Sequence, residues 1–412
     1  MIHTKRKACR GCNQTTNLHR FLQLGNQPLA NAFLKGPEYF STEKKYPLDV
    51  YFCETCSLVQ LLDVIDPSVL FSNYIYVTGT SETIAEHNKN YANTVIRQMD
   101  IKDGLVIEVA SNDGSLLKCF QAQGVKTLGI EPASNIAKIA NEAGIETIND
   151  FFNYNTSQSV RETHGAADIV IGNNVMAHVD ETQDFLRGAK HLLKPNGLTI
   201  IEVPYLGEFI ERLEYDTVYH EHLCYFSITA LITLCDAVGL VIRRIDHVPV
   251  HGGSIRVYAG PIEYYKNHSK SVMEEVAEEE RAGLTQLKRY SDFAKDVEIN
   301  KKQLLDLLNK LIRQGKSIAA YAAPAKGNTL LNYCGIDSSL IPYTVDKNSL
   351  KLNLYTPGMH LPVLPVETIL EQQPDYVLIL AWNFADEIIK QQNEYKSRGG
   401  QFIIPLPTPT II

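Results

Sequence analysis

The sequence lacks several features that would assign it to common classes of protein. It has no run of about 18 apolar residues, so we expect no membrane-spanning helix. Its net charge is −8, which disfavours nucleic acid or an anionic membrane as a partner. Its opening residues, MIHTKRKACRGC, turn polar at once, so we expect no secretory leader and a cytoplasmic location. It also lacks the GxGxxG and HExxH motifs, and both absences matter below.

What is present is a chain of 412 residues, of which 44% are hydrophobic and 21% are charged. That length predicts two or three domains, each large enough to bury a core. The patterning changes near residues 70, 268 and 314, and these positions are the predicted boundaries.

Eight cysteines are present, and four of them form two matched CxxC pairs. Cys9 and Cys12 make the first pair, and Cys53 and Cys56 make the second, 40 residues later. Because each CxxC turn can place two thiolates on one ion, the pairs predict a tetrahedral structural Zn²⁺ site. A redox or disulfide role is the alternative, but redox CxxC motifs come as single pairs that open a helix. Four cysteine ligands would close the coordination shell, so we expect no chemistry at this metal.

Strands and helices alternate from about residue 100 to residue 268. The segment LVIEVASND predicts a buried strand and a tight turn, and KTLGIEP, ADIVIGNNV and LTIIEVPYL predict further strands. Such alternation is typical of a doubly wound, Rossmann-like parallel sheet. Residues 269–314 contain no proline and predict helices between two domains, and residues 315–412 predict a second α/β unit.

A cofactor site is predicted where the first strands of residues 71–268 end. The turn after the first strand offers backbone N–H groups, and Glu131, 23 residues after Glu108, can accept hydrogen bonds from ribose hydroxyls. Without GxGxxG the backbone cannot approach a pyrophosphate closely, so S-adenosylmethionine (SAM), which has none, fits better than NAD or FAD. A dinucleotide enzyme and an inert scaffold are the alternatives. The predicted cofactor-binding residues are Glu108, Ala110, Ser111, Asn112, Asp113, Gly114, Glu131, Pro132, Asn173 and Asn174.

The stretch VYHEHLCYFS, residues 218–227, concentrates histidine, glutamate and tyrosine after the fifth strand. The second histidine of HExxH is absent, which weakens the metal interpretation, although an H-x-H metal pair and a polar core cluster are alternatives. A histidine oriented by a carboxylate can remove a proton, and tyrosine hydroxyls can stabilise an oxyanion. Beside a methyl donor, this set of groups suits methylation of a carbon next to a ketone, which must first be deprotonated. His178, after the fourth strand, is expected to approach the same place.

Taken in order, the cysteine pairs and the motifs EVASNDGSLL, GIEP, NNVMAHV, YHEHLCYFS, HGGSIRV and YAAPAKGNTLLNY resemble the nucleotide-sugar C-3 methyltransferases of the tetronitrose type. The resemblance covers nearly the whole chain. It implies a zinc-binding module (1–70), a class I SAM methyltransferase domain (71–268), a helical connection (269–314) and a sugar-nucleotide-binding domain (315–412). It also implies a nucleotide-linked 4-keto-6-deoxyhexose substrate. An O- or N-methyltransferase and an inert zinc-containing binding protein are the alternatives.

The resemblance also assigns roles to individual residues. By this resemblance, His222 matches the base that removes the C-3 proton. Other active-site positions of the family are matched by Tyr219, Glu221, His178 and Tyr76. The resemblance gives no role to His220. Lys326, Asn328 and Thr329 are expected to hold a diphosphate at a helix start. The other predicted substrate-binding residues are His251, Ser254, Arg256, Tyr321, Asn332 and Asp346. The nucleotide stays open between dTDP and GDP, and we expect a monomer or a weak dimer.

Overall fold

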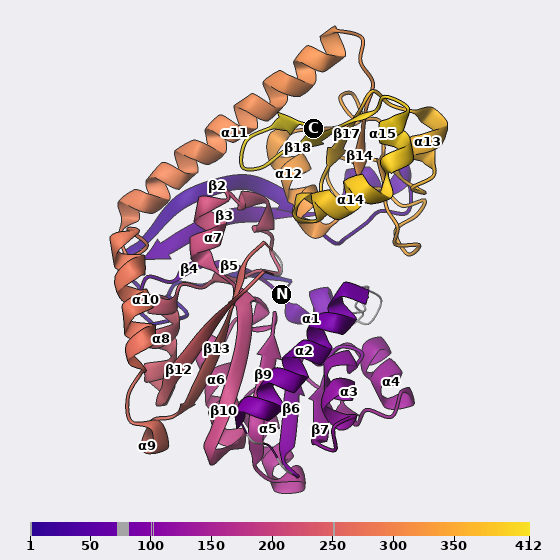
Figure 1. Cartoon of the computed structure of the whole chain (residues 1–412). Helices are drawn as coiled ribbons and strands as arrows, with labels where there is room; N and C mark the ends of the chain where they lie inside the picture. Colours follow the sequence, from indigo (N-terminus) through magenta and orange to yellow (C-terminus); the bar gives the residue numbers. More distant parts are fainter. Residues whose placement is uncertain (1, 72–81, 100, 102, 250–251) are drawn as a thin grey trace.

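The structure is a computed structural model that describes residues 2–71, 82–99, 101, 103–249 and 252–412 (Figure 1). Two predicted site residues, Tyr76 and His251, lie outside the described residues. None of the described helices is long and apolar enough to cross a membrane.

The N-terminal part is built from short antiparallel sheets. β1 (His3–Lys5) pairs with β5 (Asp63–Ile65), and a four-stranded sheet has the order β11-β4-β3-β2. Its strands are β2 (Leu18–Pro28), β3 (Lys45–Cys53), β4 (Val59–Leu61) and β11 (Cys224–Tyr225). The 3₁₀ helix η1 (Pro37–Thr42) and helix α1 (Pro67–Phe71) complete this part. Strand β11 belongs to the stretch 218–227, so a segment distant in sequence closes the N-terminal sheet.

The central part is a seven-stranded sheet with the order β12-β13-β10-β9-β6-β7-β8. Neighbouring strands from β8 to β10 run parallel, and β13 is antiparallel to both β10 and β12. The strands are β6 (Leu105–Val109), β7 (Lys126–Ile130), β8 (Thr147–Ile148), β9 (Ala167–Asn173), β10 (Leu193–Pro204), β12 (Leu240–Val248) and β13 (Ser254–Pro261). Their apolar runs are buried because helices cover the sheet, as parallel strands require.

The helices of this part alternate with the strands, as predicted for a doubly wound fold. They are α2 (Glu82–Met99), α3 (Ser115–Gln121), α4 (Ser134–Glu142), α5 (Tyr154–His164), η3 (Met176–His178), α6 (Thr182–Leu192), α7 (Leu206–Glu211), η4 (Tyr215–Thr217), α8 (Ile228–Val238) and α9 (Ile262–Tyr265).

The C-terminal part is a six-stranded sheet with the order β16-β15-β14-β17-β18-β19, parallel except for β19. Its strands are β14 (Ile318–Tyr321), β15 (Thr344–Val345), β16 (Val363–Leu364), β17 (Tyr376–Ile379), β18 (Gln401–Ile404) and β19 (Thr410–Ile411). Its helices are α12 (Ala325–Cys334), α13 (Thr368–Gln372), η5 (Trp382–Phe384), α14 (Ala385–Gln391) and α15 (Asn393–Ser397). The predicted mixed α/β fold class is confirmed.

Long helices and the N-terminal sheet connect the two larger parts. Helices α10 (Lys270–Arg281) and α11 (Leu287–Arg313) run along one side of the molecule, and β2 and β3 arch between the two α/β sheets (Figure 1). On α11, the buried Tyr290 ring stacks on Phe52 with centroids 4.4 Å apart. The N-terminal sheet therefore packs against elements of the rest of the chain and is not an isolated appendage.

Candidate functional site

The four predicted metal ligands come together at one point. The Sγ atoms of Cys9, Cys12, Cys53 and Cys56 all lie within 4.8 Å of one another. The sulfurs of Cys9 and Cys56 are 3.5 Å apart, and those of Cys12 and Cys53 are 3.6 Å apart. Tetrahedral Zn²⁺ with bonds of about 2.3 Å requires sulfurs about 3.8 Å apart, so the arrangement fits zinc.

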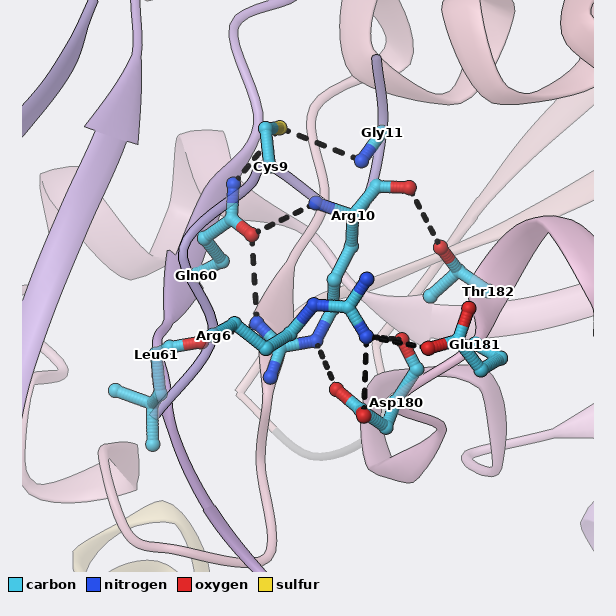
Figure 2. Close-up of polar contacts among 9 residues, drawn as sticks. All are labelled: Arg6, Cys9, Arg10, Gly11, Gln60, Leu61, Asp180, Glu181 and Thr182. Atoms are coloured by element: carbon cyan, nitrogen blue, oxygen red, sulfur yellow. Dashed lines mark hydrogen bonds and ion pairs between the residues drawn. The ribbon is translucent and has the colours of Figure 1, made fainter. Parts of the chain in front are cut away.

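Polar groups around the cysteines support this interpretation. The Gln60 side-chain amide donates to Cys9 Sγ at 2.9 Å, and the backbone N–H of Gly11 donates to the same sulfur at 3.3 Å (Figure 2). Donors of this kind stabilise a thiolate and orient a ligand toward its metal.

The turn after β6, where the cofactor is predicted to bind, has an unusual backbone. Ala110, Asn112 and Gly114 have φ values of 53°, 51° and 75°, so three residues within five positions adopt the left-handed conformation. Behind this turn, Gly129 on β7 leaves room for the Ser111 side chain, because a Cβ there would lie 2.4 Å from Ser111 Oγ. The close approach of the strand to the turn explains why β7 carries glycine at this position.

Two buried carboxyl groups, Glu108 and Glu131, lie at this turn. Glu131 accepts hydrogen bonds from the backbone N–H groups of Asn112 (3.0 Å) and Ala133 (2.8 Å), which hold it at the end of β7. Burial raises the pKa of Glu108, and its Oε2 is a buried acceptor without a hydrogen-bond partner among the described residues. Unpaired acceptors of this kind suit the ribose hydroxyls and ammonium group of SAM.

Asn173 and Asn174, at the end of β9, border the same turn. Asn173 Oδ1 accepts a hydrogen bond from the Tyr91 hydroxyl at 3.1 Å. The Tyr91 ring in turn carries the Arg256 guanidinium 3.6 Å from its centroid, and Arg256 donates to Glu202 at 2.7 Å. Arg256, predicted to bind substrate, therefore contacts groups next to the cofactor turn, and its charge is paired.

The stretch 218–227 brings His222 and Tyr219 into contact. The Tyr219 hydroxyl and His222 Nε2 are 2.8 Å apart, and His222 Nδ1 is 3.0 Å from the Thr217 carbonyl oxygen. Because a carbonyl only accepts, Nδ1 must carry the proton, which leaves Nε2 as the basic nitrogen. The fold thus fixes one tautomer of His222, with its basic nitrogen at the tyrosine hydroxyl.

His178 approaches the same place from η3, as predicted. Its ring lies 4.8 Å from the His222 ring, centroid to centroid, at an interplanar angle of 73°. Burial lowers the pKa of His178 to about 4, so the ring is neutral near pH 7. Its Nδ1 is buried without a hydrogen-bond partner among the described residues. The site therefore places the neutral His178 ring beside the His222 ring.

Glu221 and His220 face the N-terminal sheet. Asn31 donates to Glu221 Oε1 at 2.7 Å, and burial raises the pKa of Glu221 to about 7. His220 Nε2 lies 3.1 Å from the Pro47 carbonyl oxygen at β3, and burial lowers its pKa to about 4. The unassigned histidine thus anchors the stretch to the N-terminal sheet. Sequence reasoning missed Asn31, which lies 190 residues away and carries no motif.

The start of α12 holds Lys326, Asn328 and Thr329 against other parts of the chain. Asn328 donates to the Ala30 carbonyl at 2.7 Å, and the Thr329 hydroxyl donates to the Val218 carbonyl at 3.0 Å. Both side chains are buried. In the structure these two hydrogen bonds join α12 to the N-terminal part and to the stretch that carries His222.

Lys326 lies in a cluster of buried polar groups that sequence reasoning missed in part. Its ammonium lies 4.3 Å from the centroid of the Trp382 ring and donates to Asn383. Trp382 Nε1 donates to Asp216 at 2.7 Å. Burial raises the pKa of Glu214 to about 8 and that of Asp216 to about 6, and each keeps a buried oxygen without a partner among the described residues. Two features of the sequence could have pointed to this cluster: the acids Glu214 and Asp216 in the stretch LEYD, and Trp382, the only tryptophan in the sequence.

The other predicted substrate-binding residues within the described part of the chain lie on two sheets and on helix α12. Asp346 accepts the backbone N–H of Ala323 at 2.7 Å at the end of β15, and Tyr321 ends β14 beside it. Asn332 donates to the Pro357 carbonyl at 2.9 Å. Ser254 begins β13, opposite Pro204. Tyr321 and Asp346 thus lie at strand ends of the C-terminal sheet, Asn332 lies on α12 and Ser254 begins a strand of the central sheet, and their roles stay predictions.

Three family models match successive parts of the chain. A zinc binding domain matches residues 9–71, a methyltransferase domain matches residues 85–245, and a C-methyltransferase C-terminal domain matches residues 249–407. The chain is 36% identical over 405 residues to the C-methyltransferase NovU of Streptomyces niveus, which covers 98% of this chain and 96% of that protein. These matches confirm SAM and zinc as the predicted cofactors.

Solved structures resemble the chain over shorter stretches. The PH0226 protein from Pyrococcus horikoshii OT3 is 15% identical and covers 47% of this chain and 98% of its own, with a TM-score of 0.36. The CcbJ methyltransferase from Streptomyces caelestis is 11% identical and covers 42% of this chain and 89% of its own, with a TM-score of 0.34. Each covers less than half of this chain.

Proposed function

The chain belongs to the SAM-dependent C-methyltransferase family, and we propose that it methylates C-3 of a nucleotide-linked 4-keto-6-deoxyhexose. The observation that carries this proposal is the pair formed by His222 and Tyr219, with its basic nitrogen fixed by Thr217. A carbon next to a ketone must lose a proton to a base before it can be methylated, whereas an oxygen or nitrogen already has a lone pair and depends less on such a base.

In this proposal His222 Nε2 removes the C-3 proton of the sugar. The electrons of the C–H bond form the enolate double bond, and the negative charge moves to the C-4 oxygen. Without substrate the Tyr219 hydroxyl donates its one proton to Nε2, 2.8 Å away. In the proposed step this proton turns to the C-4 oxygen, which frees Nε2 to accept the C-3 proton and makes the tyrosine the donor to the enolate. The proton on Nδ1 stays on the ring and keeps its hydrogen bond to the Thr217 carbonyl, which holds the ring in place as it becomes an imidazolium.

His178 and Glu221 complete the proposed machinery. The neutral His178 ring offers an acceptor nitrogen that can hold a substrate hydroxyl. Glu221, with a pKa of about 7, can exchange a proton near the working pH. SAM, held at the turn that carries Glu108 and Glu131, would supply an electrophilic methyl group for the enolate carbon.

The nucleotide part of the substrate is proposed to bind where α12 begins. The unpaired oxygens of Glu214 and Asp216, together with Lys326 and Trp382, offer acceptors, a cation and an aromatic ring in one place. We propose dTDP as the nucleotide. Competition of free dTDP and free GDP against substrate tests this part, because only the correct nucleotide should inhibit in the micromolar range.

The reaction can be tested in two stages with purified protein. With SAM and a dTDP-4-keto-6-deoxyhexose, the product should be heavier by one CH₂ group. Without SAM in deuterium oxide, the wild-type protein should exchange the C-3 hydrogen for deuterium. His222→Ala should abolish both, whereas His247→Ala, an exposed histidine paired with Glu275, should abolish neither. Exchange at the wild-type rate in His222→Ala would remove His222 from the role of base.

A further inference from the structure

Arg10 occupies an unusual position for a charged residue. It lies inside the turn between Cys9 and Cys12, and its side chain is 0% exposed. Its Nε donates to Asp180 Oδ1 at 2.9 Å, and its Nη1 donates to the Leu61 carbonyl and to Gln60 Oε1. Figure 2 shows the guanidinium between Leu61 on one side and Asp180 on the other. A buried charge persists only when it is paired in this way.

Two of the three partners of the Arg10 side chain, Asp180 and Leu61, lead to the proposed catalytic histidines. Asp180 follows His178 by two residues. The Leu61 N–H donates to the carbonyl of Leu223 at 2.9 Å, and Leu223 follows His222 directly. The Leu223 N–H then donates to the Ala177 carbonyl at 2.7 Å, next to His178. One guanidinium therefore closes a ring of contacts that contains both histidine segments.

Further contacts hold the segment after His178 along the same cysteine turn. Arg6 pairs with Asp180 at 3.0 Å and with Glu181. The Gln183 side chain donates to the Gly11 carbonyl at 2.7 Å, and the Thr182 hydroxyl donates to the Arg10 carbonyl at 3.4 Å (Figure 2). The aspartate is the part of this segment that both arginines share.

We propose that Arg10 and Asp180 are positioning residues that set His178 against His222, so that the cysteine module forms part of the active site. This inference rests on the proposed roles of the two histidines. A scaffold that only covers the methyltransferase sheet would need no buried arginine between its metal turn and the catalytic segments. Catalytic groups need this rigidity, because a displacement of about 1 Å can cost about a hundredfold in rate.

The sharpest test compares two neighbouring carboxylates on the same loop. Asp180→Ala removes the group bound to Arg10, whereas Glu181→Ala removes a more exposed carboxylate that pairs with Arg6 alone. Asp180→Ala should lower kcat about 10- to 100-fold with KM for SAM unchanged, and Glu181→Ala should keep kcat within about twofold. An equal loss in both variants, or no loss in either, overturns the proposal. Zinc content and the thermal transition show whether each variant is folded. If Asp180→Ala does not fold, Asp180→Asn and Arg10→Lys replace it in the comparison of kcat with Glu181→Ala.

A double-mutant cycle shows whether Asp180 acts through His178. If it does, Asp180→Ala combined with His178→Ala should be no slower than His178→Ala alone, whereas multiplied losses overturn the proposal. Amide hydrogen exchange tests, without substrate, whether the contact between Arg10 and Asp180 holds the two histidine segments in place. Exchange over residues 176–179 and 222–225 should be faster in Asp180→Ala than in Glu181→Ala, and equal exchange overturns it. A wild-type protein that does not methylate the keto sugar would instead refute the proposed function.

Discussion

The hydrogen bond from Asn31 to Glu221 gives a prediction with a definite dependence on pH. Glu221 is 4% exposed, and burial raises its pKa to about 7 while the Asn31 amide opposes that rise. The bond spans 2.7 Å and joins the N-terminal part to the proposed catalytic stretch. Asn31→Ala removes the donor and leaves the carboxyl in place.

The size of the effect follows from the charge of the acceptor. A hydrogen bond to an ionised group contributes about 1.5–3 kcal/mol, and one to a neutral group about 0.5–1.5 kcal/mol. The difference of roughly 1–2 kcal/mol corresponds to about one pKa unit at 1.36 kcal/mol each, so the pKa of Glu221 should rise to about 8. Because the pKa is higher in the folded state than in the unfolded state, stability is lost as pH rises through the folded pKa. The variant should keep losing stability above pH 7, where the wild type has levelled off.

Urea unfolding of the wild type and of Asn31→Ala at pH 5, 7 and 9 measures this difference. The gap between the two proteins should widen by roughly 1–2 kcal/mol from pH 5 to pH 9. Glu221→Gln is the control background, because there the same asparagine substitution should give a gap that does not change with pH. A gap that is constant from pH 5 to pH 9 with Glu221 intact would refute this account of the pair.

Three further predictions concern the other sites. Cys56→Ser should reduce bound zinc from one ion per chain to almost none and lower the thermal transition, while calorimetry should still detect SAM binding, since the SAM turn lies on another sheet. Trp382→Phe should cost about 1–3 kcal/mol in urea unfolding, because Asp216 loses its 2.7 Å donor, and an unchanged midpoint would contradict this. Gly129→Ala should weaken SAM binding about tenfold, because its Cβ would lie 2.4 Å from Ser111 Oγ and 2.7 Å from Thr147 Oγ1 and would displace the turn, and an unchanged affinity would contradict this.

The sequence predicted best what depends on neighbouring residues. Two cysteines in a CxxC turn can reach one ion whatever surrounds them, and the four Sγ atoms do meet. Strands and helices alternate where the apolar pattern changes period, and the sheets have the predicted mixed α/β character. His178 follows β9 and the stretch of His222 follows β10, so the parallel strand pattern predicted that the two histidines would lie near one another, and their rings are 4.8 Å apart.

The sequence did not predict the partners of side chains that bind residues far along the chain. Arg256 resembles an anion-binding residue in its motif, yet its guanidinium is paired with Glu202 and packed on Tyr91. Asn328 and Thr329 bind backbone carbonyls of two other parts of the chain. No local pattern distinguishes an asparagine that binds a ligand from one that binds a distant carbonyl.

By itself the sequence determined the four clustered cysteines and the α/β architecture, and it predicted the cofactor turn and the role of the histidine-rich stretch, because turns, periodicity and acid/base chemistry are local properties. Tertiary structure alone decided that this stretch completes the N-terminal sheet through β11, that Asn31 reaches Glu221, and that Arg10 lies between two histidine segments. Those contacts join residues that are up to 190 positions apart. Their partners are selected by burial, since a polar group removed from water must be paired by whichever group the packing places beside it.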